Sequence, residues 1–223
     1  MVRANTATLP GPPAIERGGD HHPGIRQVLG EAAWRELPRA VRARFADGTQ
    51  AVDYVGAFEV VRASVLGRVV AQLARLIGTP VVPWVGTNVQ AVVHVGPADG
   101  GVAWERAYHR SASARCVVRS VKVVTPDLQM VERLPAGLCM PLRVFVSGGI
   151  LHFVSRGYYF RLSLPGGNAL HIPLPAWCSP GETHVEHIDE GDGWFRFTMT
   201  VTHVRFGELF YQTGRFRAAR ESL

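Results

Sequence analysis

Apolar residues recur at helical spacing early in the chain and at every second position later. Residues 25–48 predict two short helices, with Pro38 at the first turn of the second. Residues 51–63 have the character of a strand, and residues 64–77 predict the clearest helix. We expect this helix to cover the core or one barrel end, because one stripe holds Val65, Leu66, Val69, Val70, Leu73, Leu76 and Ile77.

From residue 87 onward, apolar and polar residues alternate, which is typical of strands. Short segments rich in glycine, proline and asparagine separate the strands, which favours an antiparallel meander. The predicted fold class is α+β, mainly β: a curved antiparallel sheet or closed barrel of about 8–10 strands with two or three N-terminal helices. The strands are expected at 87–95, 101–110, 114–124, 128–134, 139–147, 150–164, 181–189, 194–205 and 208–217.

The chain of 223 residues suits one domain with a sizeable core. Residues 1–24 are rich in proline, glycine and charge and predict a disordered extension, followed by a single barrel-like domain over 25–217 and a tail over 218–223. The start of the chain has no apolar segment of a secretory signal, and no apolar run reaches the roughly 18 residues of a membrane span.

The charged residues and cysteines exclude several functions. The net charge is +6, but the arginines are scattered and do not interleave with aromatic residues, so we expect no nucleic-acid binding. Cys116, Cys139 and Cys178 are far apart, which predicts neither a disulfide framework nor a zinc knuckle and suits the cytoplasm. The chain also has no glycine-rich phosphate loop, and we expect no cofactor.

Six segments in order resemble one family: "LGEAAWRELPRAVRARFADG", "VRASVLGRVVAQLARLIGTP", "WERAYHRSASARCVVRS", "PLPAWCSP", "GDGWFRF" and "YQTGRF". Over about residues 25–217 the chain resembles the bacterial domain-of-unknown-function family 4166. Some members of that family resemble this domain fused behind a saccharopine-dehydrogenase-like NAD(P)-binding half, which this chain lacks. The resemblance implies the domain and confers no catalytic residues.

The segment "GETHVEHIDEG" carries two histidines among acidic residues. Strand alternation places Glu182, His184 and Glu186 on one face and His187 on the other. A zinc site would need a third ligand from elsewhere, so we expect no metal. Before this strand, three prolines in "PLPAWCSP" predict a stiff connection, in which Trp177 can cover one end of a core.

Three strands place polar side chains among large apolar ones. Alternation puts His152, Arg156 and Tyr158 on one face of 150–164, although a bulge near Gly157 would swap the faces beyond it. This face is either half-exposed, with Arg156 reaching solvent, or it lines a polar-dotted cavity. The other two faces carry Trp104, Arg106 and Tyr108 on 101–110, and Phe195, Phe197 and His203 on 194–205.

If these faces line a cavity, they predict a site. His152, Tyr158 and His203 are the candidate catalytic residues, because each can donate or accept a proton. The candidate substrate-binding residues provide charge and aromatic surface, and they are Arg156, Trp104, Arg106, Tyr108, Phe195 and Phe197.

Three functions compete for such a barrel. The first is a cofactor-independent enzyme of bacterial secondary metabolism that binds a hydrophobic polyketide- or lipid-like substrate and promotes its cyclisation or isomerisation. The second is a non-catalytic module for a hydrophobic ligand, and the third is a protein-interaction domain of a dehydrogenase system. The expected partner is therefore a hydrophobic small molecule, and a homodimer is left open.

Overall fold

A computed structural model describes residues 24–46, 50–76, 78, 82, 84–98, 100–109, 115–165 and 168–219. The expected disordered extension and C-terminal tail lie outside these residues, apart from Gly24, Ala218 and Ala219. The helices are α1 (Ile25–Glu36), α2 (Arg39–Arg44), α3 (Val65–Leu76) and the 3-10 turn η1 (Pro135–Gly137). The strands are β1 (Val52–Ala63), β2 (Gly86–Ala98), β3 (Gly101–His109), β4 (Arg115–Val124), β5 (Met130–Arg133), β6 (Leu138–Ser147), β7 (Ile150–Ser155), β8 (Tyr159–Ser163), β9 (Ala169–Pro173), β10 (Glu182–Gly191), β11 (Trp194–His203) and β12 (Gly207–Ala218).

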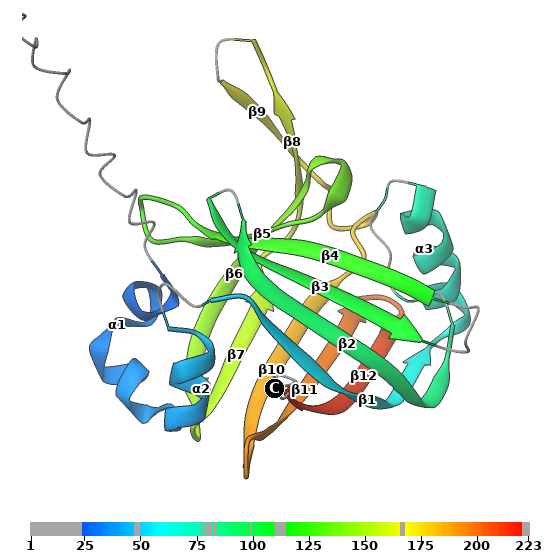
Figure 1. Cartoon of the computed structure of the whole chain (residues 1–223). Coiled ribbons are helices and arrows are strands. Elements are labelled where there is room, and N and C mark those ends of the chain that lie inside the picture. The colour runs from blue at the N-terminus through cyan, green and yellow to red at the C-terminus, as the bar shows by residue number, and fades with distance from the viewer. Residues whose placement is uncertain are drawn as a thin grey trace, which may run out of the picture.

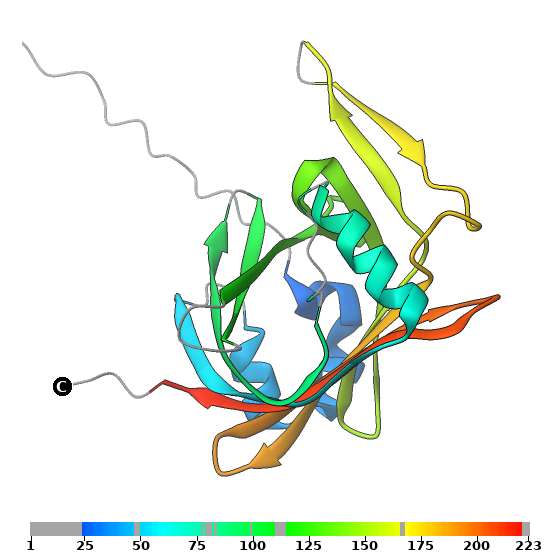
Figure 2. The ribbon, with the colours of Figure 1, turned by 90° about the vertical axis from the view of Figure 1, so that its right-hand side faces the viewer.

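Ten of the described strands close an antiparallel barrel, which confirms the predicted fold class (Figure 1). The strands follow the order β5-β4-β3-β2-β1-β12-β11-β10-β7-β6, and β6 pairs back to β5. The first and last strands, β1 and β12, lie side by side, so the two ends of the meander complete the ring (Figure 2). Closure pairs the strand edges that an open sheet would expose.

Two glycines allow β1 and β12 to approach closely. A Cβ atom at Gly214 would lie 2.4 Å from the carbonyl oxygen of Ala57, and one at Gly56 would lie 1.9 Å from that of Arg215. Neither glycine has a positive φ angle, so the requirement is for space rather than for an unusual backbone conformation. Glycine within a strand commonly marks such a close approach or a tight bend.

The helices lie at opposite ends of the barrel (Figure 1). Helix α1 packs against β6 and α2 against β10, whereas α3 packs against β12 and β1. Ser64 caps α3, because its hydroxyl accepts a 3.0 Å hydrogen bond from the Gly67 amide. Within the described residues, none of these helices has the length and apolar character needed to cross a bilayer.

Helix α3 lies at one end of the barrel (Figure 1), which is one of the two positions expected for it, but most of the described side chains of its apolar stripe do not reach the core. The exposed fractions are 71% for Val65, 50% for Val69 and 59% for Leu73. The helix instead packs through its small residues, since Ala71 is buried and Gly67 lies over the Leu209 backbone. An apolar stripe predicts that a helix packs against another surface, but it does not distinguish the core of the same domain from a separate partner. Ile77 and the Leu76 side chain lie outside the described part of the chain.

The predicted strand 150–164 is two strands. Strand β7 ends at Ser155, and the chain turns at Gly157, whose φ angle is +84°. Strand β8 then pairs with β9 in a hairpin that projects beyond the barrel (Figure 2). The alternation pattern predicted neither the break nor β9. In the connection that follows, Trp177 is 77% exposed, so it does not cover the core as expected.

Candidate functional site

Aromatic rings fill the barrel interior next to α2. Phe45 directly follows this helix, and its ring centroid lies 5.6 Å from that of Trp104 and 5.9 Å from that of Phe153. His187 of β10 lies edge-on to Phe45, with the ring centroids 5.0 Å apart. The short helix therefore inserts its C-terminal side chain between strands from both sides of the barrel.

Four charged side chains are buried among these rings. Arg44, at the end of α2, lies 3.7 Å from the ring centroid of Phe195. Lys122 of β4 is 3.1 Å from the Glu132 carboxylate of β5, and the Arg106 guanidinium of β3 is 4.0 Å from the same group. Among the described residues, three cations share the interior with the Glu132 carboxylate, and the half-buried Asp189 offsets part of the charge of Arg44. Burying an excess of positive charge is costly unless an anion compensates.

In the part of the chain that the structure describes, some polar atoms of these buried side chains and of His187 have no hydrogen-bond partner. Within the described residues, Nε and Nη1 of Arg44 and Nδ1 of His187 are buried without a partner. Buried polar atoms are nearly always hydrogen-bonded, and leaving one unpaired costs about 1–3 kcal/mol. The two unsatisfied nitrogen atoms of Arg44 could therefore donate hydrogen bonds to an acceptor from outside the chain.

Burial and neighbouring charge set the protonation of the interior. Burial lowers the pKa of His187 well below its usual value, and Arg44, Lys122 and Arg106 lower it further. The imidazole is therefore neutral at neutral pH. Burial also lowers the pKa of the Arg44 guanidinium, an effect that Tyr54 and Asp189 partly offset.

The tyrosines of the interior are protonated and paired. Burial raises the pKa of Tyr108 to about 12, and its hydroxyl donates a 3.2 Å hydrogen bond to Gln212. Burial likewise raises the pKa of Tyr158, whose hydroxyl is 2.8 Å from that of Thr183. Neither hydroxyl is suited to act as a base in this state.

The structure brings six of the nine predicted site residues into the barrel interior. They are Trp104, Arg106, Tyr108, Tyr158, Phe195 and Phe197. Alternation along 101–110 and 194–205 placed the β3 and β11 residues correctly, because neither strand is interrupted there.

The other three predicted site residues lie elsewhere. His152 is on the outer face, since the adjacent Phe153 points inward, and Arg156 is exposed after the end of β7. The prediction that His152, Arg156 and Tyr158 share one face is therefore wrong, and the stated alternative, a swap of faces at irregular backbone near Gly157, describes where Tyr158 lies. His203 lies at the barrel end, where its Nδ1 accepts a hydrogen bond from the Arg205 amide.

Sequence reasoning missed four charged or titratable groups of the interior: Arg44, Lys122, Glu132 and His187. Alternation assigned His187 to the face of Val185, and that apolar neighbour was the available signal. A second available signal was that Lys122 is the single lysine of the sequence. Nothing local indicated Arg44, because it reaches the interior only through the docking of α2 on the barrel.

Three residues on the outer face could hold a metal ion. His152 Nδ1 lies 3.0 Å from His184 Nε2 and 3.5 Å from a Glu186 carboxylate oxygen. One ligand atom from each residue falls within 4.8 Å of the other two. Sequence analysis placed His184 and His187 on opposite faces, as observed, but did not consider that β7 pairs with β10 and supplies His152.

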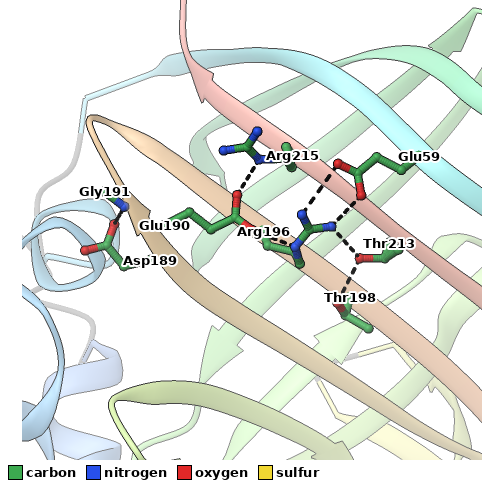
Figure 3. Close-up of polar contacts among 8 residues, drawn as sticks. All are labelled: Glu59, Asp189, Glu190, Gly191, Arg196, Thr198, Thr213 and Arg215. Atoms are coloured by element: carbon green, nitrogen blue, oxygen red, sulfur yellow. Dashed lines mark hydrogen bonds and ion pairs between the residues drawn. The ribbon is translucent and has the colours of Figure 1, made fainter.

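Elsewhere on the outer face, charges are paired by an ion-pair network (Figure 3). Arg196 of β11 binds Glu59 at 2.5 Å and Glu190 at 2.6 Å, and Arg215 of β12 also contacts Glu190. This network is a solvated charged surface that joins β1, β10, β11 and β12 and needs no ligand to explain it.

A surface cleft of about 410 Å³ lies outside the barrel between η1 and the β8–β9 hairpin. Its lining includes Arg133, Cys139 and Arg161. None of the predicted site residues lines it, and burial raises the pKa of the Cys139 thiol, which disfavours the reactive thiolate.

A family model described as a domain of unknown function, DUF4166, matches residues 37–216. No curated protein and no solved structure showed a significant match to the chain. The match covers the barrel and α2, which carry the interior charges.

Proposed function

Because the chain belongs to the DUF4166 family of domains of unknown function, we propose a function from the geometry of its barrel: it binds an acidic, largely apolar small molecule in the interior beside α2. The carrying observation is that Arg44 and His187 are buried with polar atoms lacking a hydrogen-bond partner within the described residues. A carboxylate or enolate oxygen would supply the missing acceptor and offset the excess of positive charge. The aromatic rings around it suit an apolar body.

Phe45 controls entry in this proposal. Its ring lies among Trp104, Phe153 and His187, where an apolar ligand would also pack. It follows a helix of only six residues, so the movement of a short segment would open that end of the barrel. Ligand binding is therefore coupled to the displacement of α2 or of the Phe45 side chain.

The enzymatic form of this function is an isomerisation or cyclisation of a carbonyl substrate without a cofactor. The neutral His187 can take a proton from the carbon next to the carbonyl, and Arg44 and Lys122 stabilise the resulting enolate oxygen. Return of the proton at another carbon completes an isomerisation with no net change in atoms or electrons. Binding of the anion also offsets the cations that lower the pKa of His187, so proton acceptance is easier in the complex.

The alternative is a binding module that uses the same interior without turnover. A predicted catalytic role for Tyr158 fits neither form well, because its hydroxyl is paired with Thr183. The roles predicted for His152 and His203 would have to act outside the interior. A protein-interaction domain is the remaining alternative, and it requires no ligand in the barrel.

The test uses cis-parinaric acid, a fluorescent fatty acid, and its uncharged methyl ester. Arg44→Leu should weaken binding of the acid by roughly ten- to a hundredfold, the value of a charged hydrogen bond. It should affect the ester much less and leave the melting temperature nearly unchanged, because it removes a buried cation with two unsatisfied nitrogen atoms along with its contacts to Tyr54 and Asp189. Affinity is measured by fluorescence titration and stability by thermal unfolding.

Arg156→Ala is the matched control, since Arg156 is an exposed arginine that the sequence placed in the site. It should change neither affinity nor stability. Equal binding of acid and ester, or an equal loss in both variants, would refute recognition of an acidic group by Arg44. Absence of any binding by the unmodified chain would favour the interaction domain.

A further inference from the structure

We propose that His152, His184 and Glu186 bind a divalent first-row transition metal ion of the zinc class on the outer face of the barrel. Two imidazole nitrogens and one carboxylate oxygen form a common donor set for zinc, which leaves a fourth position for water. The site lies on the face opposite His187 and is separate from the proposed ligand site in the interior.

Strand geometry preorganises the three ligands. His184 and Glu186 are two residues apart on β10 and so share a face, and His152 of β7 pairs directly with Glu186 in the register. The His152 ring is stacked on Phe145, with centroids 4.7 Å apart and planes 11° from parallel. It is also hydrogen-bonded to the Ser147 backbone. Such outer contacts orient metal-binding histidines.

Two of the three separations between ligand atoms fit a shared ion, and the third, between His184 and Glu186, is within 4.8 Å. Two ligand atoms at about 2.1 Å from a metal are separated by about 3.0–3.4 Å in octahedral or tetrahedral geometry. The observed separations are 3.0 Å between His152 Nδ1 and His184 Nε2, and 3.5 Å between His152 Nδ1 and Glu186. A hydrogen bond between the two imidazoles accounts for the first distance, and the cross-strand pairing of β7 with β10 places Glu186 beside His152. The pairing thus holds all three ligand groups near one point before any ion binds.

The charge balance also favours a cation. In the network on the same face, Glu59 and Glu190 are each paired with arginine. Among the ion pairs of the described residues, Glu186 has neither arginine nor lysine and contacts only His152. The Glu186 side chain is 28% exposed, so an ion can reach the site from solvent.

The metal test is made on the untagged full chain, stripped with chelator, loaded with zinc and desalted. Elemental analysis should find one zinc ion per chain, and His184→Ala should lower zinc affinity roughly tenfold or more. Zinc should raise the melting temperature of the unmodified chain and not that of His184→Ala. Glu186→Gln, which preserves side-chain shape, should also weaken binding.

His171→Ala, which removes an exposed histidine of β9, is the control and should retain zinc fully. No zinc retention by the unmodified chain, or equal retention in His184→Ala, would overturn the proposal in favour of a simple imidazole hydrogen bond. Neither result depends on whether the barrel interior binds a ligand.

A second, independent observation concerns exposed apolar side chains. Among the described residues, fifteen large hydrophobic side chains are exposed, and eleven lie in three segments: 64–76, 159–181 and 203–207. The eleven are Val65, Leu66, Val69, Leu73, Leu162, Leu164, Leu170, Ile172, Trp177, Val204 and Phe206; the other four are Val85, Val102, Val117 and Leu128. We refer to these three segments as the apolar end.

The three segments are neighbours around one end of the barrel (Figure 2). The Ser64 amide at the start of α3 donates to the Leu209 carbonyl, next to the turn 203–207. Gly181 lies against the backbone of Thr202 and His203, and thus joins that turn to the loop carrying Trp177. Such a concentration of exposed apolar surface marks an interaction site.

The charges of the apolar end favour an anionic partner. Its segments contain Arg68, Arg75, Arg161 and Arg205 and no aspartate or glutamate. The exposed Glu182 and Glu208 directly follow two of the segments, and Glu208 is paired with Arg62. Trp177 and Phe206 are 77% and 57% exposed on connections between strands, where aromatic rings can enter a lipid headgroup layer. We infer that the apolar end docks on an anionic lipid bilayer.

The docking test is co-sedimentation with vesicles of phosphatidylcholine alone or mixed with phosphatidylserine. The full chain should bind the mixed vesicles, and replacing both Trp177 and Phe206 by serine should abolish binding. Arg68→Gln should weaken binding about fivefold, the value of one surface arginine near an anionic membrane. Leu73→Ala should weaken it without a large loss of stability, because Leu73 is 59% exposed.

Leu128→Ser, at an exposed position outside the apolar end, is the matched control and should bind like the unmodified chain. Failure of the full chain to bind the mixed vesicles would overturn the inference. So would a dimer, detected by size-exclusion chromatography with light scattering, that the Trp177 and Phe206 replacements dissociate, because the face would then be covered by a second copy.

Discussion

Glu132→Ala should destabilise the barrel by about 3–5 kcal/mol, the usual cost of breaking a buried ion pair. Burial alone would raise the pKa of Glu132, but Lys122 and Arg106 outweigh it and hold that pKa below its usual value. The carboxylate is therefore ionised between two cations that are largely shielded from water. Replacing Glu132 by alanine leaves Lys122 and Arg106 in the interior without the anionic group that pairs with them. Urea unfolding monitored by tryptophan fluorescence measures the change.

A double variant separates the ion pair from simple packing. Lys122→Met combined with Glu132→Leu replaces the pair by apolar side chains of similar size, and such replacements are often neutral. The double variant should recover most of the stability that Glu132→Ala loses. A loss in the double variant equal to or greater than that of Glu132→Ala would mean that the charges themselves stabilise the fold.

Gly214→Ala should destabilise the protein by more than about 4 kcal/mol, which is exceptional for a single substitution. The new Cβ atom would lie 2.4 Å from the Ala57 carbonyl oxygen and 2.7 Å from the Phe58 Cα atom. Both contacts are with backbone, so β1 and β12 must separate to make room. Because this pairing closes the ring, we expect loss of the cooperative unfolding transition as well.

Gly86→Ala is the control for this prediction. Its Cβ atom would meet only the side-chain Cγ2 atom of Val89, at 3.2 Å, which can move aside. The cost there should be small compared with that at Gly214. Similar melting temperatures for the two variants would show that β1 and β12 tolerate a wider separation than the structure indicates.

The barrel could be predicted because alternation in long, uninterrupted strands reports a local property, the side of the sheet on which a residue lies. This logic placed Trp104 and Phe197 correctly. It failed after Ser155, where the turn at Gly157 moved Tyr158 to the opposite face from His152. A single residue of irregular backbone is enough to reverse the later assignments within the same predicted strand.

The rest of the candidate sites depends on contacts between distant segments. His152 meets Glu186 only because β7 pairs with β10 after the chain leaves the barrel to form the β8–β9 hairpin. Arg44 reaches Phe195 only because α2 docks across the barrel end. The apolar stripe of α3 was visible in the sequence, but amphipathicity alone does not distinguish a surface that faces the core from one that awaits another partner.

Lys122 gives this barrel a chemical reporter of its own opening. It is the sole lysine of the sequence, and its amine lies between Glu132 and the ring of Trp104, with a side chain only 9% exposed. Burial also lowers its pKa, an effect that Glu132 partly offsets. In the folded state, the burial of this side chain limits the access of acylating reagents to the lysine amine. The rate at which Lys122 becomes acylated thus measures how often the strands of the barrel separate. Hydrogen exchange of backbone amides gives the same kind of information for backbone groups.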